Sequence, residues 1–153
     1  MRSAKCRVIA AFALCLLAGA ARASCHAASG NLSFGPYDPL GGAGSSSSSV
    51  VAIHCAVNPV PTVRVKVAPS AVSGGFVPRR MRQAGGQETL EYNLYVDPGG
   101  NWVWGDGSGG TLTLSESVAP GKPWTITIYA RIPPGQDVTP GTYVDTIGIE
   151  IEF

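Results

Sequence analysis

Charged side chains are scarce in this chain of 153 residues, of which only 14% are Asp, Glu, Lys or Arg. Four of the eleven basic residues lie in the first 23 residues, so the rest of the chain carries seven basic and ten acidic side chains, a net charge of −3. A weakly acidic body without a basic stripe is poorly suited to bind nucleic acid or an anionic lipid surface. We therefore expect neither of these partners.

Long helical stretches are lacking as well. Gly and Pro together make up 32 of the 153 residues, a content that disfavours long helices and indicates many turns. Apolar and polar residues alternate in short runs, with the two-residue period that is typical of strands with one buried face. These runs are residues 31–35, 50–55, 63–67, 90–96, 111–115, 124–132 and 143–153.

The connections between these runs have the composition of turns. Residues 41–49 include five consecutive serines and are predicted to form a flexible loop, and the Gly-rich residues 105–110 are predicted to form a tight turn. About seven short strands in about 130 residues, with closely spaced turn signals, are the pattern of an antiparallel β-sandwich. The expected fold class is therefore all-β, with two sheets around one core.

No stretch of the sequence is apolar for long enough to cross a membrane. The longest, residues 8–18, follows a basic segment and precedes two small residues spaced for cleavage after Ala23, the order found in a secretory signal peptide. A membrane anchor or a buried helix is the alternative. We predict a signal peptide at residues 1–23, one mature domain at residues 24–153, and no membrane span after cleavage.

Cysteines are few in the predicted mature chain. Cys6 and Cys15 leave with the signal peptide, so Cys25 and Cys55 remain, in an oxidising compartment. Such a pair most simply forms one disulfide, and closing a loop of about 31 residues stabilises the fold by roughly 3–4 kcal/mol. Two free buried thiols are the alternative.

One set of residues resembles an active site. His54, Asp97 and the Gly-Asp-Gly-Ser-Gly-Gly segment at residues 105–110 follow the order of the catalytic residues of chymotrypsin-like proteases. Gly107 is inserted ahead of Ser108, which displaces the neighbouring N–H groups that an oxyanion hole needs. The mature chain is also too short for two six-stranded barrels. We therefore expect no enzyme and no catalytic residue.

Metal ligands are scarce too. His26 and His54 are the only histidines, too few for a multi-histidine site, and His54 is expected to face solvent. Asp97, Asn101 and Asp106 are oxygen donors in a Gly-rich loop, but they lack the spacing of a calcium-binding loop. No metal and no cofactor are expected.

Two clusters have a structural and a functional interpretation. Arg79, Arg80 and Arg82 form a short basic cluster that is expected to be a solvated loop, with a surface contact as the alternative. Trp102 and Trp104 share one face of an extended segment and are expected in the core, with a sugar-stacking platform as the alternative.

Several short motifs, taken in order, carry a family resemblance. They are Cys25, N-L-S-F-G-P-Y-D at residues 31–38, Cys55, R-M at residues 80–81, L-E-Y-N-L-Y-V-D at residues 90–97, W-G-D-G at residues 104–107, Y-A-R-I-P at residues 129–133 and G-T-Y-V-D-T-I at residues 141–147. The set spans almost the whole mature chain and resembles the spore coat protein U domain family, which includes secreted pilins of archaic chaperone–usher systems. The resemblance implies structural roles for Phe34, Gly35, Tyr37, Asp38, Tyr92, Tyr95, Trp104, Gly105, Arg131, Gly141, Tyr143 and Asp145.

The resemblance implies an immunoglobulin-like sandwich that lacks its last strand, with an open groove along the final one. In such pilins a periplasmic chaperone fills the groove, and the N-terminal extension of a neighbouring subunit later replaces it. The residues expected to line the groove are Ile147, Ile149, Ile151 and Phe153, which form an apolar row at the end of the sequence. Basic chaperone residues are expected to hold the carboxylate of Phe153, and an ordinary terminal strand is the alternative.

The expected function follows from this resemblance. The chain is expected to be a structural subunit of a secreted chaperone–usher pilus or surface coat, exported through the periplasm and acting in adhesion or biofilm formation. Its expected partners are the periplasmic chaperone, the outer-membrane usher and neighbouring pilin subunits. Cleavage after Ala23 leaves only Ser24 ahead of the first cysteine, where fibre-forming relatives carry a donor extension, so a tip or non-polymerising subunit is expected. A self-contained carbohydrate-binding or adhesive module is the alternative.

Overall fold

The computed structural model describes residues 24–28, 30–56 and 62–153. The predicted signal peptide, residues 1–23, lies outside these ranges. Within them no helix is long and apolar enough to cross a membrane. The strands are β1 (Cys25–Ala28), β2 (Ser45–Cys55), β3 (Thr62–Val67), β4 (Arg79–Gln83), β5 (Thr89–Tyr95), β6 (Leu114–Ser117), β7 (Trp124–Ile132), β8 (Tyr143–Val144) and β9 (Ile149–Glu152).

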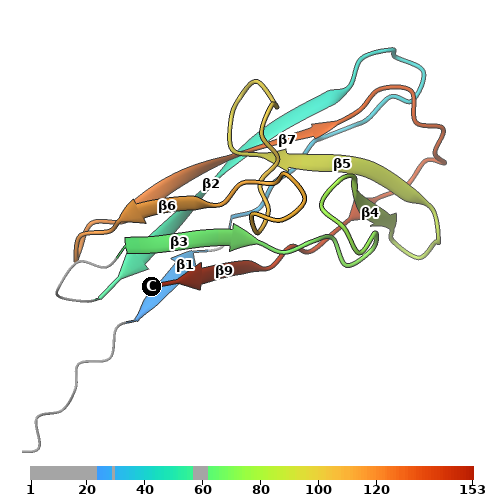
Figure 1. Cartoon of the computed structure of the whole chain (residues 1–153). Coiled ribbons are helices and arrows are strands. Elements are labelled where there is room, and N and C mark those ends of the chain that lie inside the picture. The colour runs from blue at the N-terminus through green and yellow to red at the C-terminus, as the bar shows by residue number, and fades with distance from the viewer. Residues whose placement is uncertain (1–23, 29, 57–61) are drawn as a thin grey trace, which may run out of the picture.

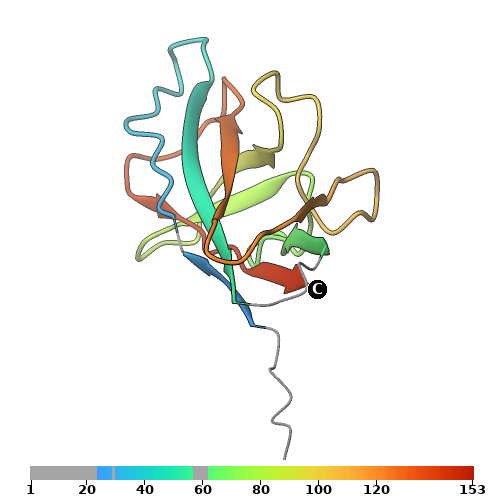
Figure 2. The ribbon, with the colours of Figure 1, turned by 90° about the vertical axis from the view of Figure 1, so that its left-hand side faces the viewer.

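These strands form two sheets, as Figure 1 shows. The larger sheet has the order β1-β2-β7-β5-β4-β8 and the smaller one the order β6-β3-β9, and neighbouring strands within each sheet are antiparallel. The view along the sandwich places the long strands β2 and β7 on one side and β3 with β9 on the other (Figure 2). The expected all-β, immunoglobulin-like antiparallel sandwich is confirmed.

The core divides into two clusters along the larger sheet. The first cluster lies between the two sheets and includes Ile53 of β2 and Val65 of β3, both fully buried. The second cluster is built from β4, β5 and β7 around Leu90 and Tyr92. Among the described residues the smaller sheet adds no side chain to this second cluster, and the non-strand residues around Phe34 pack against it instead. The sandwich is therefore two-layered at one end and covered by irregular chain at the other.

The serine run is not the flexible loop that its composition predicts, because residues 45–49 form the first half of β2. Three alternate serines face inward, in phase with the buried Val51. Their small side chains leave room for residues 31–34, whose backbone carbonyls they bind. The expectation of a first strand at residues 31–35 is therefore wrong, and the first strand is β1, paired with the end of β2.

The C-terminal run splits where its alternation predicts one continuous strand. β8 pairs with β4 in the larger sheet, whereas β9 pairs with β3 in the smaller sheet. Residues 145–148 cross from one sheet to the other. Further upstream β7 has the expected bounds, but β6 begins at Leu114, later than the pattern of residues 111–115 indicates.

The two tryptophans that were expected together in the core are separated. Trp104 is fully buried, and its indole nitrogen donates a hydrogen bond to the carbonyl of Val65 at 3.4 Å. Trp102 is 55% exposed, so the prediction is wrong for this residue. Trp102 lies in a bend just ahead of the bridges that Val103 and Trp104 make, so the alternation of an extended strand, which would place both tryptophans on one face, does not reach it.

Candidate functional site

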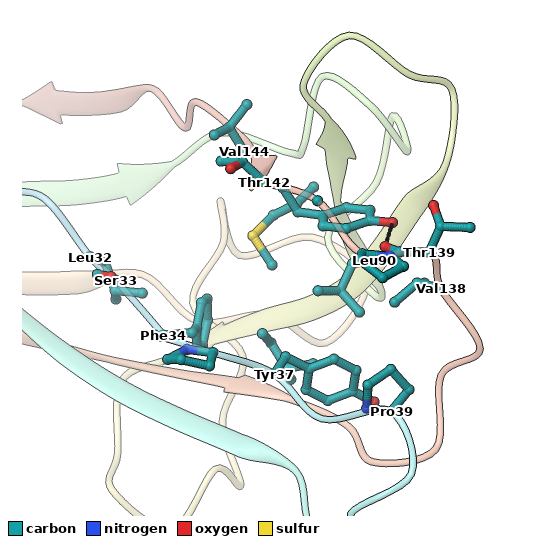
Figure 3. Close-up of a pocket in the computed structure, with 17 residues that line it drawn as sticks. Leu32, Ser33, Phe34, Tyr37, Pro39, Leu90, Val138, Thr139, Thr142 and Val144 are labelled. Atoms are coloured by element: carbon teal, nitrogen blue, oxygen red, sulfur yellow. Dashed lines mark hydrogen bonds between the residues drawn. The ribbon is translucent and has the colours of Figure 1, made fainter.

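An apolar groove opens over the second core cluster. It consists of two cavities of about 640 and 460 Å³ that share Leu32, Phe34, Met81, Tyr143 and Val144 among their lining residues. One side is formed by residues 30–37, which we call the N-terminal wall, and the other by residues 142–149, the C-terminal wall. Figure 3 shows Phe34 and Tyr37 on one side of the larger cavity and Val144 on the other.

The N-terminal wall is held by serine hydroxyls rather than by a backbone ladder. Ser47 Oγ donates a hydrogen bond to the carbonyl of Ser33 at 2.6 Å, and Ser49 Oγ donates to that of Asn31 at 2.8 Å. Ser45 makes a similar, longer contact to Phe34. These bonds use carbonyl groups only, and within residues 24–28, 30–56 and 62–153 the backbone N–H groups of residues 31–34 donate no hydrogen bond to another backbone group.

Aromatic side chains fasten the same wall to the larger sheet. Phe34 meets the ring of Tyr92 edge-on, with 6.1 Å between centroids. The hydroxyl of Tyr37 donates to the carbonyl of Pro133 and accepts from the N–H of Gln136, both at 3.0 Å. The wall is thus anchored at its far end and tied more lightly along residues 31–34.

The C-terminal wall is fixed where it crosses between the sheets. The hydroxyl of Tyr92 donates to Oδ2 of Asp145 at 2.8 Å, and the other carboxylate oxygen accepts the N–H of Thr146. Burial raises the pKa of Tyr92, and the hydrogen bond to Asp145 raises it further. The phenol therefore stays protonated and keeps donating throughout the physiological range.

Glu88 supports the same wall from its beginning. Its carboxylate accepts the N–H of Thr139 at 2.7 Å and the hydroxyl of Tyr143 at 3.0 Å. These hydrogen bonds, led by the backbone one from Thr139, lower the pKa of Glu88. An ionised carboxylate thus positions the strand that forms the outer rim of the groove.

The guanidinium of Arg79 is a buried cation beneath the groove. The expectation that the basic cluster is a solvated loop is therefore wrong for Arg79. Arg79 has no exposed surface. Its Nη2 donates to the carbonyls of Trp104 at 2.8 Å and Ala68 at 3.1 Å, and its Nη1 donates to Oδ1 of Asn93 at 3.1 Å. Burial lowers the pKa of Arg79, although Arg remains charged in proteins. The one feature of the sequence that could have indicated this burial is that Arg79 stands two residues before the core residue Met81, on the same face of β4.

The two walls are not joined to each other. Among the described residues no backbone hydrogen bond links the N-terminal wall to the C-terminal wall. β1 and β9, which continue the two walls, lie near each other but belong to different sheets and are not paired (Figure 1). Unpaired edges on both sides of an apolar groove are suited to accept an added strand.

The four residues predicted to line the groove do not lie together in it. Ile147 and Ile149 line the smaller cavity. Ile151 packs against the first core cluster, as Ile147 and Ile149 also do, and Phe153 is 55% exposed. Neither cavity includes these last two residues. The sequence did not indicate the residues that form the floor of the groove, above all Met81 and Leu94. Their alternation with polar residues predicts burial in a core and does not show that this part of the core is open to a cavity.

The remaining candidates for chemistry are engaged elsewhere. Ser108 Oγ donates to Oδ1 of Asp106 at 2.6 Å, whereas Asp97 accepts hydrogen bonds from Asn101 and from the N–H of Trp102. His54 stacks on another side chain and makes no hydrogen bond to Ser108 or Asp97 in the described part of the chain. The described part of the chain contains no group of three or more His, Cys, Asp or Glu residues that could hold a metal ion.

Comparison with known proteins agrees with the ordered motifs. A model of the Spore Coat Protein U domain matches residues 11–150. The chain belongs to the spore coat protein U domain family. A relative in this family, Protein U of Myxococcus xanthus, is 36% identical over 146 residues, which cover 88% of this chain and 78% of that protein.

A solved structure shares the fold of this family member. It is the CsuC–CsuE chaperone–tip adhesion subunit pre-assembly complex from the archaic chaperone–usher Csu pili of Acinetobacter baumannii, with a TM-score of 0.62 and 21% sequence identity. The match covers 86% of this chain, which spans 40% of the matched chain. At this level of identity the likeness concerns the fold.

The motif residues of the family are distributed over the groove and its supports. Phe34 and Tyr37 lie in the N-terminal wall, and Gly141, Tyr143 and Asp145 lie in or beside the C-terminal wall. Tyr92 lies in the floor of the groove, and Trp104 lies in the core. Arg131 lies over the ring of Tyr95. Gly35 has a φ of 69°, and Asp38 accepts the N–H of Leu40 in the following turn. Gly105 is required by close approach, since a Cβ there would lie 2.4 Å from Oγ1 of Thr111. The disulfide expected between Cys25 and Cys55 is present and joins β1 to β2.

Proposed function

We propose that this protein is a non-enzymatic structural subunit of a secreted pilus or surface coat. Its groove accepts an extended segment of another protein as an added strand. The segment comes from a periplasmic chaperone during export and from a neighbouring subunit in the assembled structure. On this proposal a signal peptide at residues 1–23 directs export, an outer-membrane usher passes the subunit to the surface, and the assembled protein acts in adhesion or biofilm formation.

The observation that carries the proposal is the pair of unjoined walls. The groove between them is lined mainly by apolar side chains of both walls and of the floor. An incoming strand with alternating apolar residues would bury its side chains in the cavities while its backbone pairs with the walls. Without an added strand the apolar surface of the groove faces water, which costs about 25 cal/mol of free energy for each Å² of apolar area.

The named relatives support the same proposal. Protein U belongs to the family that this chain shares. The Csu structure is a chaperone–tip adhesion subunit pre-assembly complex, and one of its chains has the fold seen here. A subunit that is stored with a chaperone fits a fold whose edges are unpaired.

A designed strand tests the proposal. The mature chain, residues 24–153, is titrated with a synthetic peptide of about twelve alternating Val and Thr residues, ended by lysines for solubility. We expect the peptide to raise the thermal unfolding midpoint and to protect the amide protons of residues 31–34 and 145–148 from exchange. A peptide that binds as a strand in the groove should protect the amide protons of both walls. A peptide that binds elsewhere should not.

Two matched substitutions locate the binding. Val144 is 55% exposed and lines both cavities, so Val144→Asp is tolerated by the fold but places a charge in the filled groove. It should weaken peptide binding about tenfold or more. Val77, 65% exposed and outside both cavities, provides the control Val77→Asp. The proposal fails if the peptide does not bind and residues 145–148 are already fully protected in the free chain.

The exposed tryptophan favours a second candidate function. Trp102 is 55% exposed beside the polar turn of Asp97 and Asn101, and an exposed indole is suited to stack on a sugar ring. A carbohydrate-binding module that folds alone would show quenching of Trp102 fluorescence by added glycans, and Trp102→Ala would abolish it. Glycan binding without any binding of the designed strand would favour this function over the first.

A further inference from the structure

The two histidines of the chain lie face to face on the outside of the larger sheet. His26 of β1 is directly opposite His54 of β2 in the antiparallel register. Their rings are stacked, with 5.3 Å between centroids and 14° between planes. His26 is exposed and His54 is half-buried. The sequence contains no other histidine.

We propose that His26 and His54 together bind a divalent transition-metal ion. The ion is of the borderline class that prefers imidazole, such as Cu²⁺, Ni²⁺ or Zn²⁺. Both imidazoles act as ligands through one nitrogen each, and water completes the coordination. One ion is bound per chain, and the site is independent of the groove, because neither histidine lines either of the two groove cavities.

The geometry suits two imidazoles on one ion. Nitrogen ligands bind zinc at about 2.0–2.1 Å, so two of them on the same ion lie roughly 3 Å apart. In the stacked arrangement the nitrogen lone pairs of the two rings lie in nearly parallel planes, so both side chains turn out of the stack to converge on one ion, and the 5.3 Å between centroids shows that they start within reach of each other. Residues directly opposite in an antiparallel pair have Cβ atoms about 5 Å apart, which keeps both rings over the same point of the sheet.

The pair is preorganised on both strands. The disulfide between Cys25 and Cys55 joins the register position next to His26 and His54. The strand β1 is therefore tied covalently to β2 one residue away from the ligands. Neither imidazole makes a hydrogen bond with another part of the described chain, so the ring nitrogens remain open to a ligand.

The absence of a third ligand sets the class of site. No group of three or more His, Cys, Asp or Glu surrounds the pair in the described part of the chain. A closed structural zinc site needs four protein ligands, so the pair forms an open, exchangeable chelate instead. Two ligands on one scaffold bind more tightly than one because the second binding step is intramolecular.

Calorimetric titration with copper chloride and zinc chloride tests the site on mature protein that carries no histidine tag. We expect one ion per chain, and His26→Ala and His54→Ala should each weaken binding roughly 100-fold. Ser48→Ala, on the same outer face of β2, should leave the affinity unchanged, and magnesium chloride should not bind.

Ring-proton resonances of the unmodified protein give a second measurement that does not depend on the folding of a variant. Zinc should shift the signals of both histidines in one saturable step. Equal copper and zinc affinities for the unmodified protein and both alanine variants would overturn the proposal. A zinc titration that moves neither resonance, or only one of them, would overturn it as well.

Discussion

The hydroxyl of Tyr92 donates a hydrogen bond to Oδ2 of Asp145 across 2.8 Å. This bond joins the middle of the larger sheet to the point where the C-terminal wall leaves it for the smaller sheet. Tyr92 is 5% exposed, so water does not readily replace the lost partner if either group is removed. This pair of side chains therefore fixes the crossover of the C-terminal wall, between the strand pairings of β8 and β9.

Tyr92→Phe should lower the free energy of unfolding by about 1–2 kcal/mol, because it removes a hydrogen bond to a carboxylate and keeps the packing of the ring against Phe34. Urea unfolding of the mature protein measures the change. Tyr95→Phe is the control, since Tyr95 lies next to Arg131 without a hydrogen bond from its hydroxyl in the described chain. An equal loss in both variants would mean that the Asp145 contact contributes nothing.

Arg79→Met should lower the free energy of unfolding by at least about 3 kcal/mol. The substitution leaves the carbonyls of Trp104 and Ala68 and the amide of Asn93 without a donor inside the fold. Arg82→Met, on an exposed position of the same strand, should change it by less than about 0.5 kcal/mol. Comparable urea midpoints for the two variants would contradict this role of the buried guanidinium.

The strands that could be predicted from the sequence are those whose alternation is strict. Residues 124–132 form β7 with the expected bounds, and the Val63, Val65 and Val67 row forms the inner face of β3. Alternation reports which face of a strand meets the core, and this information is local. It sufficed for the fold class and for the two-sheet arrangement.

The parts that could not be predicted depend on contacts between distant residues. Serine is favoured in loops, and the placement of residues 45–49 in β2 follows from carbonyl groups of residues 31–34 that their hydroxyls bind. Charged side chains are almost never fully buried, and Arg79 is buried because acceptors from three separate segments converge on it. No local pattern shows such convergence.

The groove was only partly predictable for the same reason. The family resemblance pointed to the C-terminal row, and Ile147 and Ile149 of that row line the smaller cavity. The resemblance also named Phe34 and Tyr37 as structural residues, without indicating that they form the opposite wall. The break in the row at residues 145–148 moves Ile151 and Phe153 away from the cavities, and alternation alone does not show a change of sheet.

Glu88→Gln should destabilise the protein in a pH-dependent way. The folded state lowers the pKa of Glu88, so its contribution to stability is fully present above the unfolded value of about 4.3 and is lost as the pH falls through the lower folded value. The difference in unfolding free energy between wild type and Glu88→Gln should therefore be constant above about pH 5.5 and shrink as the pH falls below the unfolded value of about 4.3.

Urea unfolding at a series of pH values measures this difference. Glu116→Gln is the control, because Glu116 is exposed in β6 and has no hydrogen-bond partner among the described residues. A difference between wild type and Glu88→Gln that grows as the pH falls would show that the hydrogen bonds to Thr139 and Tyr143 do not stabilise the ionised carboxylate.

Ser47→Ala should loosen the N-terminal wall without unfolding the sheet. The substitution removes the hydroxyl that holds the carbonyl of Ser33 at 2.6 Å, while alanine fits the inner face of β2. We expect a loss of about 1 kcal/mol in unfolding free energy and faster amide exchange confined to residues 31–34. Ser48→Ala, whose side chain points to solvent on the same strand, should change neither.

Because the wall is one of the two edges open to an added strand, a looser wall should also weaken binding of the designed peptide. Identical exchange rates at residues 31–34 in both serine variants would mean that the backbone of this wall is held by something other than the serine hydroxyls.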